Sequence, residues 1–283
     1  MGTEGSSQTA VFERQATLES WDRDYYNPVA ERYYDRAVST MLELMEAQPG
    51  ATVLDAGCGP GVHSVRAARS GYRVCAIDIS KNMLREAESR AVKSGLSSSV
   101  EFREEDLTRL TFPDASFRYV FSWGVIIHIP EVEKTLDELA RIIEPGGKLA
   151  LYVTNKNCWD QKLESMARFV LRKPLEGRET LALGDGVWFN MSGEKLWVWQ
   201  FDVDALCRQL ERRGLFLTHR VIGEFSEVQR RVSGPLRSML LRLNNLCYRL
   251  KLPPGIASAN LLVFRKGSDI GVASRSAVVI QAG

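Results

Sequence analysis

Residues 53–61, with the sequence VLDAGCGPG, constrain the fold of this chain more than any other segment. A short apolar run leads to an acid, Asp55, and then to a loop with glycine at every second position, at Gly57, Gly59 and Gly61. Glycine tolerates positive φ and has no Cβ, so a ligand can lie directly against the backbone of this loop. A strand, such a loop and a helix in succession predict a ligand site at the carboxyl end of a parallel strand.

The spacing of the glycines distinguishes two kinds of nucleotide-binding loop. A dinucleotide-binding loop follows G-x-G-x-x-G, but Val62 stands at the third glycine position here. A second acid, Asp78, ends the next predicted strand at 73–78, and Ser80 caps the helix after it. The alternate glycines and Asp78 together resemble motif I and the ribose-binding acid of the class I S-adenosylmethionine-dependent methyltransferases, although the glycines alone also fit a turn in another α/β protein.

Further segments extend this resemblance over roughly residues 50–154. They follow in the order that the family has: strand 100–104, the acid Asp106, strand 117–122, helix 131–143, a Pro-Gly-Gly turn at 145–147 and strand 148–153. The resemblance implies a doubly wound α/β fold, in which a seven-stranded, mostly parallel sheet ends in an antiparallel last strand and carries helical lid insertions.

The resemblance also assigns roles to the residues around the loop. Asp55 and the three glycines would hold the methionine part of S-adenosylmethionine, Asp78 the ribose and Asp106 the adenine. Three neighbours complete the predicted cofactor site: Ile79, Leu107 and Ser122. The product would be S-adenosylhomocysteine, and no metal is expected.

His128 is the candidate catalytic base. It follows the fourth strand at a position that faces the reaction centre in the family, and imidazole titrates in a range suited to proton transfer. The alternative is an imidazole that only bonds to neighbouring backbone. His63, just after the glycine loop, is expected near the cofactor carboxylate, and His219 is expected to lie far from the site.

The remaining segments divide the chain around this core. The predicted parts are a flexible segment with cap helices at 1–48, the cofactor-binding core at 49–154, a substrate-lid insertion at 155–200, the rest of the core at 201–266 with an inserted helix at 235–250, and a disordered tail at 267–283.

Aromatic residues outside the core are the candidates for binding the substrate. Tyr25 and Tyr26 precede the first long helix, and Trp123 follows the fourth strand. Four of the six tryptophans, including Trp188, lie in the insertion, where the family builds its acceptor pocket. Rigid rings suit an apolar or aromatic acceptor. The alternative is that the rings only fasten the insertion to the core.

The helix at 235–250 is amphipathic and lies in a basic region. Residues 205–266 carry twelve Lys and Arg against three Asp and Glu, while the whole chain has a net charge of only +2. Such a helix can lie on an anionic membrane or receive an acidic substrate. The favoured interpretation is that it packs on its own core or on a dimer partner, with its arginines in solvent. Its apolar face is expected to be covered.

Composition limits the other classes of function. The five cysteines are scattered and form no Cys-x-x-Cys pair, so neither a disulfide framework nor a zinc site is indicated. No apolar run approaches the length of a membrane span, and the N-terminal residues form no signal peptide. We therefore expect a cytoplasmic protein. Its near-neutral charge, and the lack of a motif that grips an extruded base, argue against nucleic acid as the substrate.

These observations predict a methyltransferase of small molecules. The favoured acceptor is a mainly apolar secondary metabolite, quinone or isoprenoid-like compound. A membrane-associated lipid or glycolipid precursor is the first alternative, and a protein that binds the cofactor without catalysis is the second. Peripheral membrane contact and a homodimer remain open.

Overall fold

An eight-stranded sheet organises the computed structural model, which describes residues 11–14, 28–172, 178–191, 194–230, 232, 234–268 and 279–280. Its order is β11-β9-β10-β5-β4-β1-β2-β3. The strands are β1 (Thr52–Ala56), β2 (Arg73–Asp78), β3 (Val100–Glu104), β4 (Phe117–Trp123), β5 (Ile143–Thr154), β9 (Leu215–Ile222), β10 (Ala259–Lys266) and β11 (Val279–Ile280).

The sheet has the predicted topology. β1 lies between β2 and β4, and these pairs are parallel, as are β2 with β3 and β4 with β5. β10 runs antiparallel to both β5 and β9. The seven-stranded, mostly parallel sheet with an antiparallel last strand is thus confirmed, with the two-residue β11 added beside β9.

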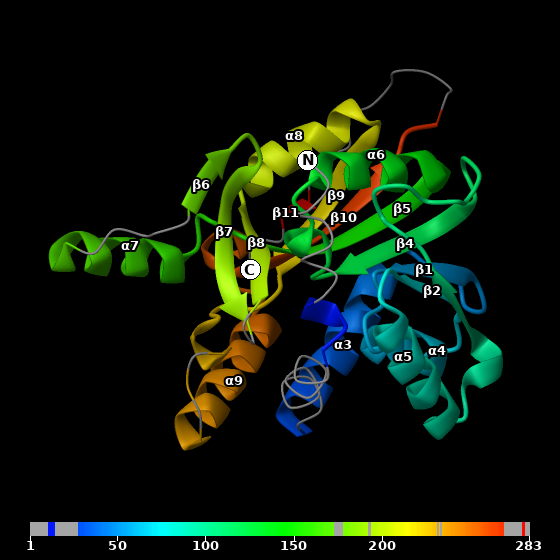
Figure 1. Cartoon of the computed structure of the whole chain (residues 1–283), viewed down its shortest axis with the longest axis horizontal. Helices are drawn as coiled ribbons and strands as arrows, with labels where there is room; N and C mark the ends of the chain where they lie inside the picture. Colours follow the sequence, from blue (N-terminus) through cyan, green and yellow to red (C-terminus); the bar gives the residue numbers. More distant parts are fainter. Residues whose placement is uncertain are drawn as a thin grey trace.

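Helices cover both faces of the sheet (Figure 1). The helices are α3 (Pro28–Leu44), α4 (Val62–Arg69), α5 (Lys81–Lys93), α6 (Val132–Ile142) and α8 (Val203–Arg212). Buried side chains of α3 and α4 belong to one apolar cluster, and those of α6 and α8 belong to a second cluster on the other face. β1 lies between the two clusters because its side chains alternate between them: Val53 belongs to the first, and Leu54 to the second.

Local signals explain where several elements begin. Ser80 accepts a hydrogen bond from the Met83 N–H at 3.1 Å, which caps α5 as predicted. Asp202 caps α8 in the same way through the Ala205 N–H, at 3.1 Å. The predicted Pro-Gly-Gly turn is absorbed into the start of β5, where Ile143 already pairs with Phe117 across a register irregularity.

The insertion differs from the helical lid that the sequence predicted. It contains one helix, α7 (Trp159–Leu171), and then a separate antiparallel sheet of three strands. These strands are β6 (Arg178–Leu181), β7 (Gly184–Met191) and β8 (Glu194–Phe201). Alternate residues of β8 point to one face, so Trp197, Trp199 and Phe201 all reach the core beside α6 and α8, which favours strand over helix.

The C-terminal part of the chain carries α9 (Gly234–Arg249) between β9 and β10. This matches the predicted helix at 235–250 within one residue. No helix in the described ranges combines the length and the apolar character that crossing a membrane requires.

Candidate functional site

The glycine loop turns sharply over the end of β2. Gly57, Gly59 and Gly61 have φ of 89°, 52° and 76°, in the left-handed region that favours glycine. The N–H groups of Gly57 and Cys58 donate to the Ile77 carbonyl at 2.9 and 2.8 Å. The loop is therefore fixed at the carboxyl ends of β1 and β2, as the sequence predicted.

Two of these glycines also permit close packing. A Cβ on Gly57 would lie 2.3 Å from Cγ1 of Val125, and a Cβ on Gly61 would lie 2.8 Å from the Cβ of Ala87. Both distances are far below van der Waals contact. Glycine is required at these positions by space as well as by φ.

We expect Gly57→Ala to destabilise the protein by about 2–5 kcal/mol, since left-handed strain of ~1–2 kcal/mol adds to overpacking of ~1–3 kcal/mol. Gly50→Ala is the matched control. Gly50 also has a positive φ of 77°, but nothing lies within 4 Å of its added Cβ, so only the strain remains. Urea unfolding of both variants measures the difference, and equal losses would contradict the packing argument.

Asp78 closes the loop from the end of β2. Its Oδ2 accepts the Gly59 N–H at 2.8 Å, and its Oδ1 accepts the Ser80 N–H at 2.9 Å. Burial raises the pKa of Asp78, while the backbone N–H groups of Ser80 and Gly59 act to lower it. The carboxyl group is held rigidly beside the exposed Ile79.

Asp55 lies on β1, buried one strand away from Asp78. Its Oδ2 accepts a hydrogen bond of 2.6 Å from the Ser64 hydroxyl of α4. Burial raises its pKa to about 7, the Ser64 hydrogen bond opposes this shift, and the charge of Asp78 adds to it. Two carboxyl groups that share a buried site are suited to a cationic partner.

The predicted adenine side has a different geometry. Oδ1 of Asp106 accepts both the backbone N–H and the hydroxyl of Thr108 at 2.8 Å. Leu107 is buried in the core, and Ser122 donates its hydroxyl to the Ala56 carbonyl at 2.8 Å, which ties β4 to β1. The contacts of Leu107 and Ser122 are thus structural ones.

An aromatic cluster lies where β4 and β5 end. Trp123 stacks on Tyr152 with ring centroids 4.3 Å apart and an angle of 13°. His63 of α4 lies 4.7 Å from Trp123, and Tyr34 of α3 contacts both. Burial and the charge of Arg66 lower the pKa of His63, so this imidazole is neutral at physiological pH.

A buried acid that the sequence analysis missed joins this cluster. Glu224 follows β9, and its Oε1 accepts the Tyr34 hydroxyl at 3.3 Å. Its Oε2 accepts the amide of Gln229 at 3.1 Å. Asp55 and Asp78 likewise lie at the carboxyl ends of β1 and β2. An acid just after β9 was therefore the sequence signal that could have identified Glu224. Tyr152, inside β5, gave no such signal.

His128 ends the short 3-10 helix η2 (Ile126–His128) after β4. Its Nδ1 lies 3.0 Å from the Trp197 carbonyl of the insertion. A carbonyl oxygen only accepts, so Nδ1 carries the hydrogen, and in the neutral ring Nε2 is the basic nitrogen. The predicted contact between His128 and backbone is therefore present. It orients the ring, and it fixes the tautomer in which Nε2 can accept a proton, as a base requires.

The insertion tryptophans form a packed row. Trp188 of β7 meets Trp197 edge-on at 5.1 Å, and Trp199 stacks on Phe201. Trp199 also donates its Nε1–H to the Ile129 carbonyl at 2.8 Å. Trp197 and Trp199 thus fasten the insertion to the segment that carries His128. Trp188 is only half-buried.

Some predicted residues lie apart from this site or outside the described ranges. Tyr25 and Tyr26 are outside the residues that the structure describes. His219 lies on β9, where it pairs with Val263 of β10. In the described part of the chain, no three His, Cys, Asp or Glu side chains are grouped so as to hold a metal ion.

Comparison with known proteins matches residues 53–147 to a methyltransferase domain. Methyltransferase GfsG of Streptomyces halstedii is 33% identical over 144 residues, which cover 50% of this chain and 51% of that protein. The ubiquinone biosynthesis O-methyltransferase of Xanthomonas euvesicatoria pv. vesicatoria (strain 85-10) is 34% identical over 144 residues, with 48% and 56% covered. The chain thus spans about half the length of these curated relatives.

A solved structure matches nearly the whole chain. Magnesium protoporphyrin IX methyltransferase (ChlM) from Synechocystis PCC 6803, solved with bound S-adenosylhomocysteine, superposes with a TM-score of 0.61 over 93% of this chain and 100% of that one. The sequences are 18% identical, so this similarity concerns the fold.

Proposed function

We propose that the chain binds S-adenosylmethionine and transfers its methyl group to a small, mainly apolar metabolite, because residues 53–147 match a methyltransferase domain and the whole chain resembles a methyltransferase in fold. The observation that carries the proposal is the pair of carboxyl groups at the glycine loop, the buried Asp55 and the half-buried Asp78. The relatives named above support a small molecule as acceptor.

The residues at the loop fit this cofactor. Asp78 is fixed by the N–H groups of Gly59 and Ser80, which orients its carboxyl group for the two hydroxyls of a ribose. Asp55, one strand away, supplies the anionic partner for the amino group of the methionine part. Asp106 stays the proposed adenine contact, and Ile79 offers an exposed apolar side chain beside the ribose.

S-adenosylmethionine supplies a methyl group on a positively charged sulfur. The protein must align an acceptor atom with that group and exclude water. The stacked Trp123 and Tyr152 give the site an apolar wall at the ends of β4 and β5. For an oxygen or nitrogen acceptor, His128 is the proposed base, and the Trp197 carbonyl holds its ring in position.

The acceptor class rests on the aromatic surroundings. Trp123 and the half-buried Trp188 are the proposed substrate contacts among the described residues, and rings of this kind suit an apolar or aromatic acceptor. A membrane-associated lipid or glycolipid precursor shares this chemistry and is the second candidate. A third is a protein that binds the cofactor without turnover. Any measurable rate of methyl transfer eliminates this third candidate.

If His128 is the base, His128→Ala should lower turnover by roughly 10²-fold or more and leave cofactor affinity nearly unchanged. Replacing the neighbouring ring, as in Phe12→Leu, is the matched control, because Phe12 contacts His128 at 5.9 Å between centroids and has no titratable group. Steady-state rates and calorimetry separate the two effects. A loss of cofactor affinity alone would assign His128 a structural role.

The first experiment is a calorimetric titration with S-adenosylmethionine and S-adenosylhomocysteine. Micromolar binding of both, followed by a screen of apolar and acid-bearing acceptors with radiolabelled methyl, is the expected course. Failure of both ligands to bind would refute the proposed function.

A further inference from the structure

The apolar stripe of α9 is exposed, although the sequence predicted that something would cover it. Five side chains at helical spacing form this stripe and are between 40 and 60% exposed: Leu236, Met239, Leu243, Leu246 and Leu250. The helix is held to the body from its other side, by the buried Asn244, Cys247 and Tyr248. Figure 1 shows α9 extending away from the sheet. The structure thus presents a continuous apolar ridge on a helix that is anchored along a neighbouring face.

The ridge lies within a uniformly basic stretch. Residues 228–251 contain no Asp or Glu and six basic residues: Arg230, Arg231, Arg237, Arg242, Arg249 and Lys251. Arg242 and Arg249 are exposed. They lie one i,i+3 step after Met239 and Leu246, so both follow the same edge of the ridge. Within the described residues, neither of these two arginines is part of an ion pair.

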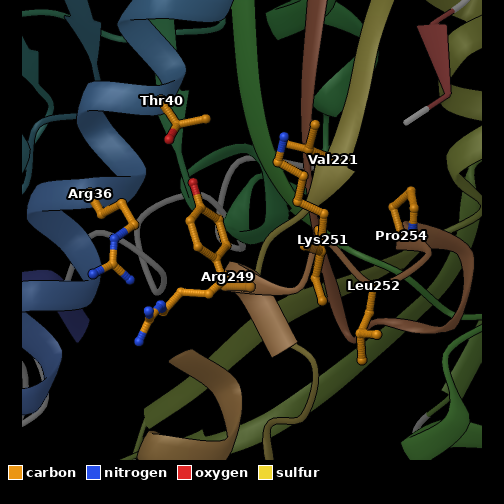
Figure 2. A pocket seen from close by; sticks show the side chains of 9 residues that line it. Arg36, Thr40, Val221, Arg249, Lys251, Leu252 and Pro254 are labelled. Carbon is orange, nitrogen blue, oxygen red and sulfur yellow. The ribbon is translucent and has the colours of Figure 1, made fainter. Parts of the chain in front are cut away.

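A basic pocket of about 250 Å³ opens where α9 ends (Figure 2). Arg36 enters it from α3, Arg249 from α9 and Lys251 from the segment after α9. Val221 and Leu252 give it apolar walls. Arg36 donates to Oδ1 of Asn245 at 2.7 Å, which fixes its guanidinium near α9. The pocket is lined by these three cations. The negative charge of the exposed Glu43 acts on Tyr248 in the pocket wall, and it is smaller than the positive charge of the three cations.

We propose that α9 docks on the surface of an anionic phospholipid bilayer, with its apolar ridge in the interfacial region and a lipid phosphate in the Arg36–Arg249–Lys251 pocket. A helix with apolar residues on one face and arginines along the border of that face matches the chemistry of such a surface. The pocket provides a headgroup site at the end of α9, where its lining residues Arg249 and Lys251 flank Leu250, the last residue of the ridge.

Charge separates this occupant from a second copy of the chain. In a symmetric dimer formed through the ridge, the exposed Arg242 and Arg249 at its edge would face a surface of the same charge, and residues 228–251 contain no acid to neutralise it. An anionic bilayer offers the complementary charge instead. This proposal does not depend on the methyltransferase activity, because it concerns a surface outside the glycine loop.

Cosedimentation with vesicles tests the docking. The full chain should bind vesicles of equal parts phosphatidylglycerol and phosphatidylcholine at ~0.1 M salt and bind them more weakly at ~1 M salt. It should show no measurable binding to vesicles made of phosphatidylcholine only. Binding that is equal for both compositions, or no binding to either, overturns the proposal.

Variants assign the binding to α9. Met239→Glu with Leu243→Glu should weaken vesicle binding by roughly tenfold or more, and so should Arg249→Glu with Lys251→Glu. Val92→Glu is the control, because Val92 is 65% exposed on α5, away from this surface. Circular dichroism and calorimetry with S-adenosylmethionine check that each variant stays folded. Unchanged vesicle binding by both double variants overturns the proposal.

Two further outcomes identify other occupants. Light scattering without lipid that shows a dimer, which Met239→Glu with Leu243→Glu converts to a monomer, would assign the ridge to a second copy. Saturable binding of inorganic phosphate by the pocket without any vesicle binding would assign it to a free anion. Either result overturns the docking.

Discussion

Asp78→Ala should weaken binding of S-adenosylmethionine and S-adenosylhomocysteine by roughly 10- to 100-fold, the equivalent of about 1.5–3 kcal/mol for lost hydrogen bonds to a charged group. The expected loss has two parts. The variant removes the proposed acceptor of the ribose hydroxyls, and it also leaves the Gly59 and Ser80 N–H groups without their present partner. The loop itself should therefore become less well ordered.

Two further variants separate these parts. Asp78→Asn keeps an oxygen that can accept one of the two N–H groups, so it should lose less affinity than Asp78→Ala. Glu104→Ala, at the end of the neighbouring β3, removes an exposed acid that pairs with Lys81 and should leave affinity unchanged. Isothermal calorimetry measures all three. Unchanged affinity of a folded Asp78→Ala protein would remove Asp78 from the proposed site.

Asp55 should make the stability of the ligand-free protein fall as the pH rises. Its carboxyl group has a pKa of about 7 in the folded chain, against 3.8 for the ordinary value, because of burial. Between these values the folded state holds a proton that the unfolded state has released. The stabilisation of the folded state by this proton is therefore fully present below pH ~4 and is lost as the pH rises through about 7. The free energy of unfolding falls by about 4 kcal/mol at most.

Asp55→Asn isolates this effect. The amide keeps an oxygen that can accept the Ser64 hydroxyl and carries no charge, so the variant should be more stable than the parent at pH ~8 and similar to it at pH ~4. The measurement is the difference in free energy of urea unfolding between the two proteins across this range. A difference that does not change with pH would show that Asp55 titrates normally.

Asp55 should also make the affinity for S-adenosylmethionine depend on pH. A cationic partner favours the ionised carboxyl group, so affinity for S-adenosylmethionine should increase as the pH rises towards 7 and level off above it. This increase should be absent from Asp55→Asn. Stability and affinity thus change with pH in opposite directions, which follows from the two roles of one buried acid.

The core of the fold could be predicted because its signals are local and repeated. The strand at 73–78 has the bounds that the sequence indicated, as β2. Its apolar run is buried on both faces of the parallel part of the sheet, and such burial needs a continuous apolar run that can be read directly from the sequence. The positions of Asp55 and Asp78 follow, because each acid stands at the end of such a run.

The insertion could not be predicted in the same way. The segment around Trp197 and Trp199 has the alternation of a strand, but whether a strand forms depends on a partner, and β7 supplies that partner by pairing Trp188 with Trp197 and Gly186 with Trp199. The contact between His128 and the Trp197 carbonyl depends on that pairing. Sequence reasoning therefore reached His128 and left its orientation open.

The sequence by itself determined the doubly wound sheet, the glycine loop and the two acids beside it, because each rests on residues close together in the chain. Only the tertiary structure decided that Glu224 joins Tyr34 in a buried cluster, that Ser122 bonds within the sheet, and that the ridge of α9 is exposed. These outcomes depend on distant segments that meet only after folding, and the burial of a side chain is a property of all of its neighbours rather than of its own position in the sequence.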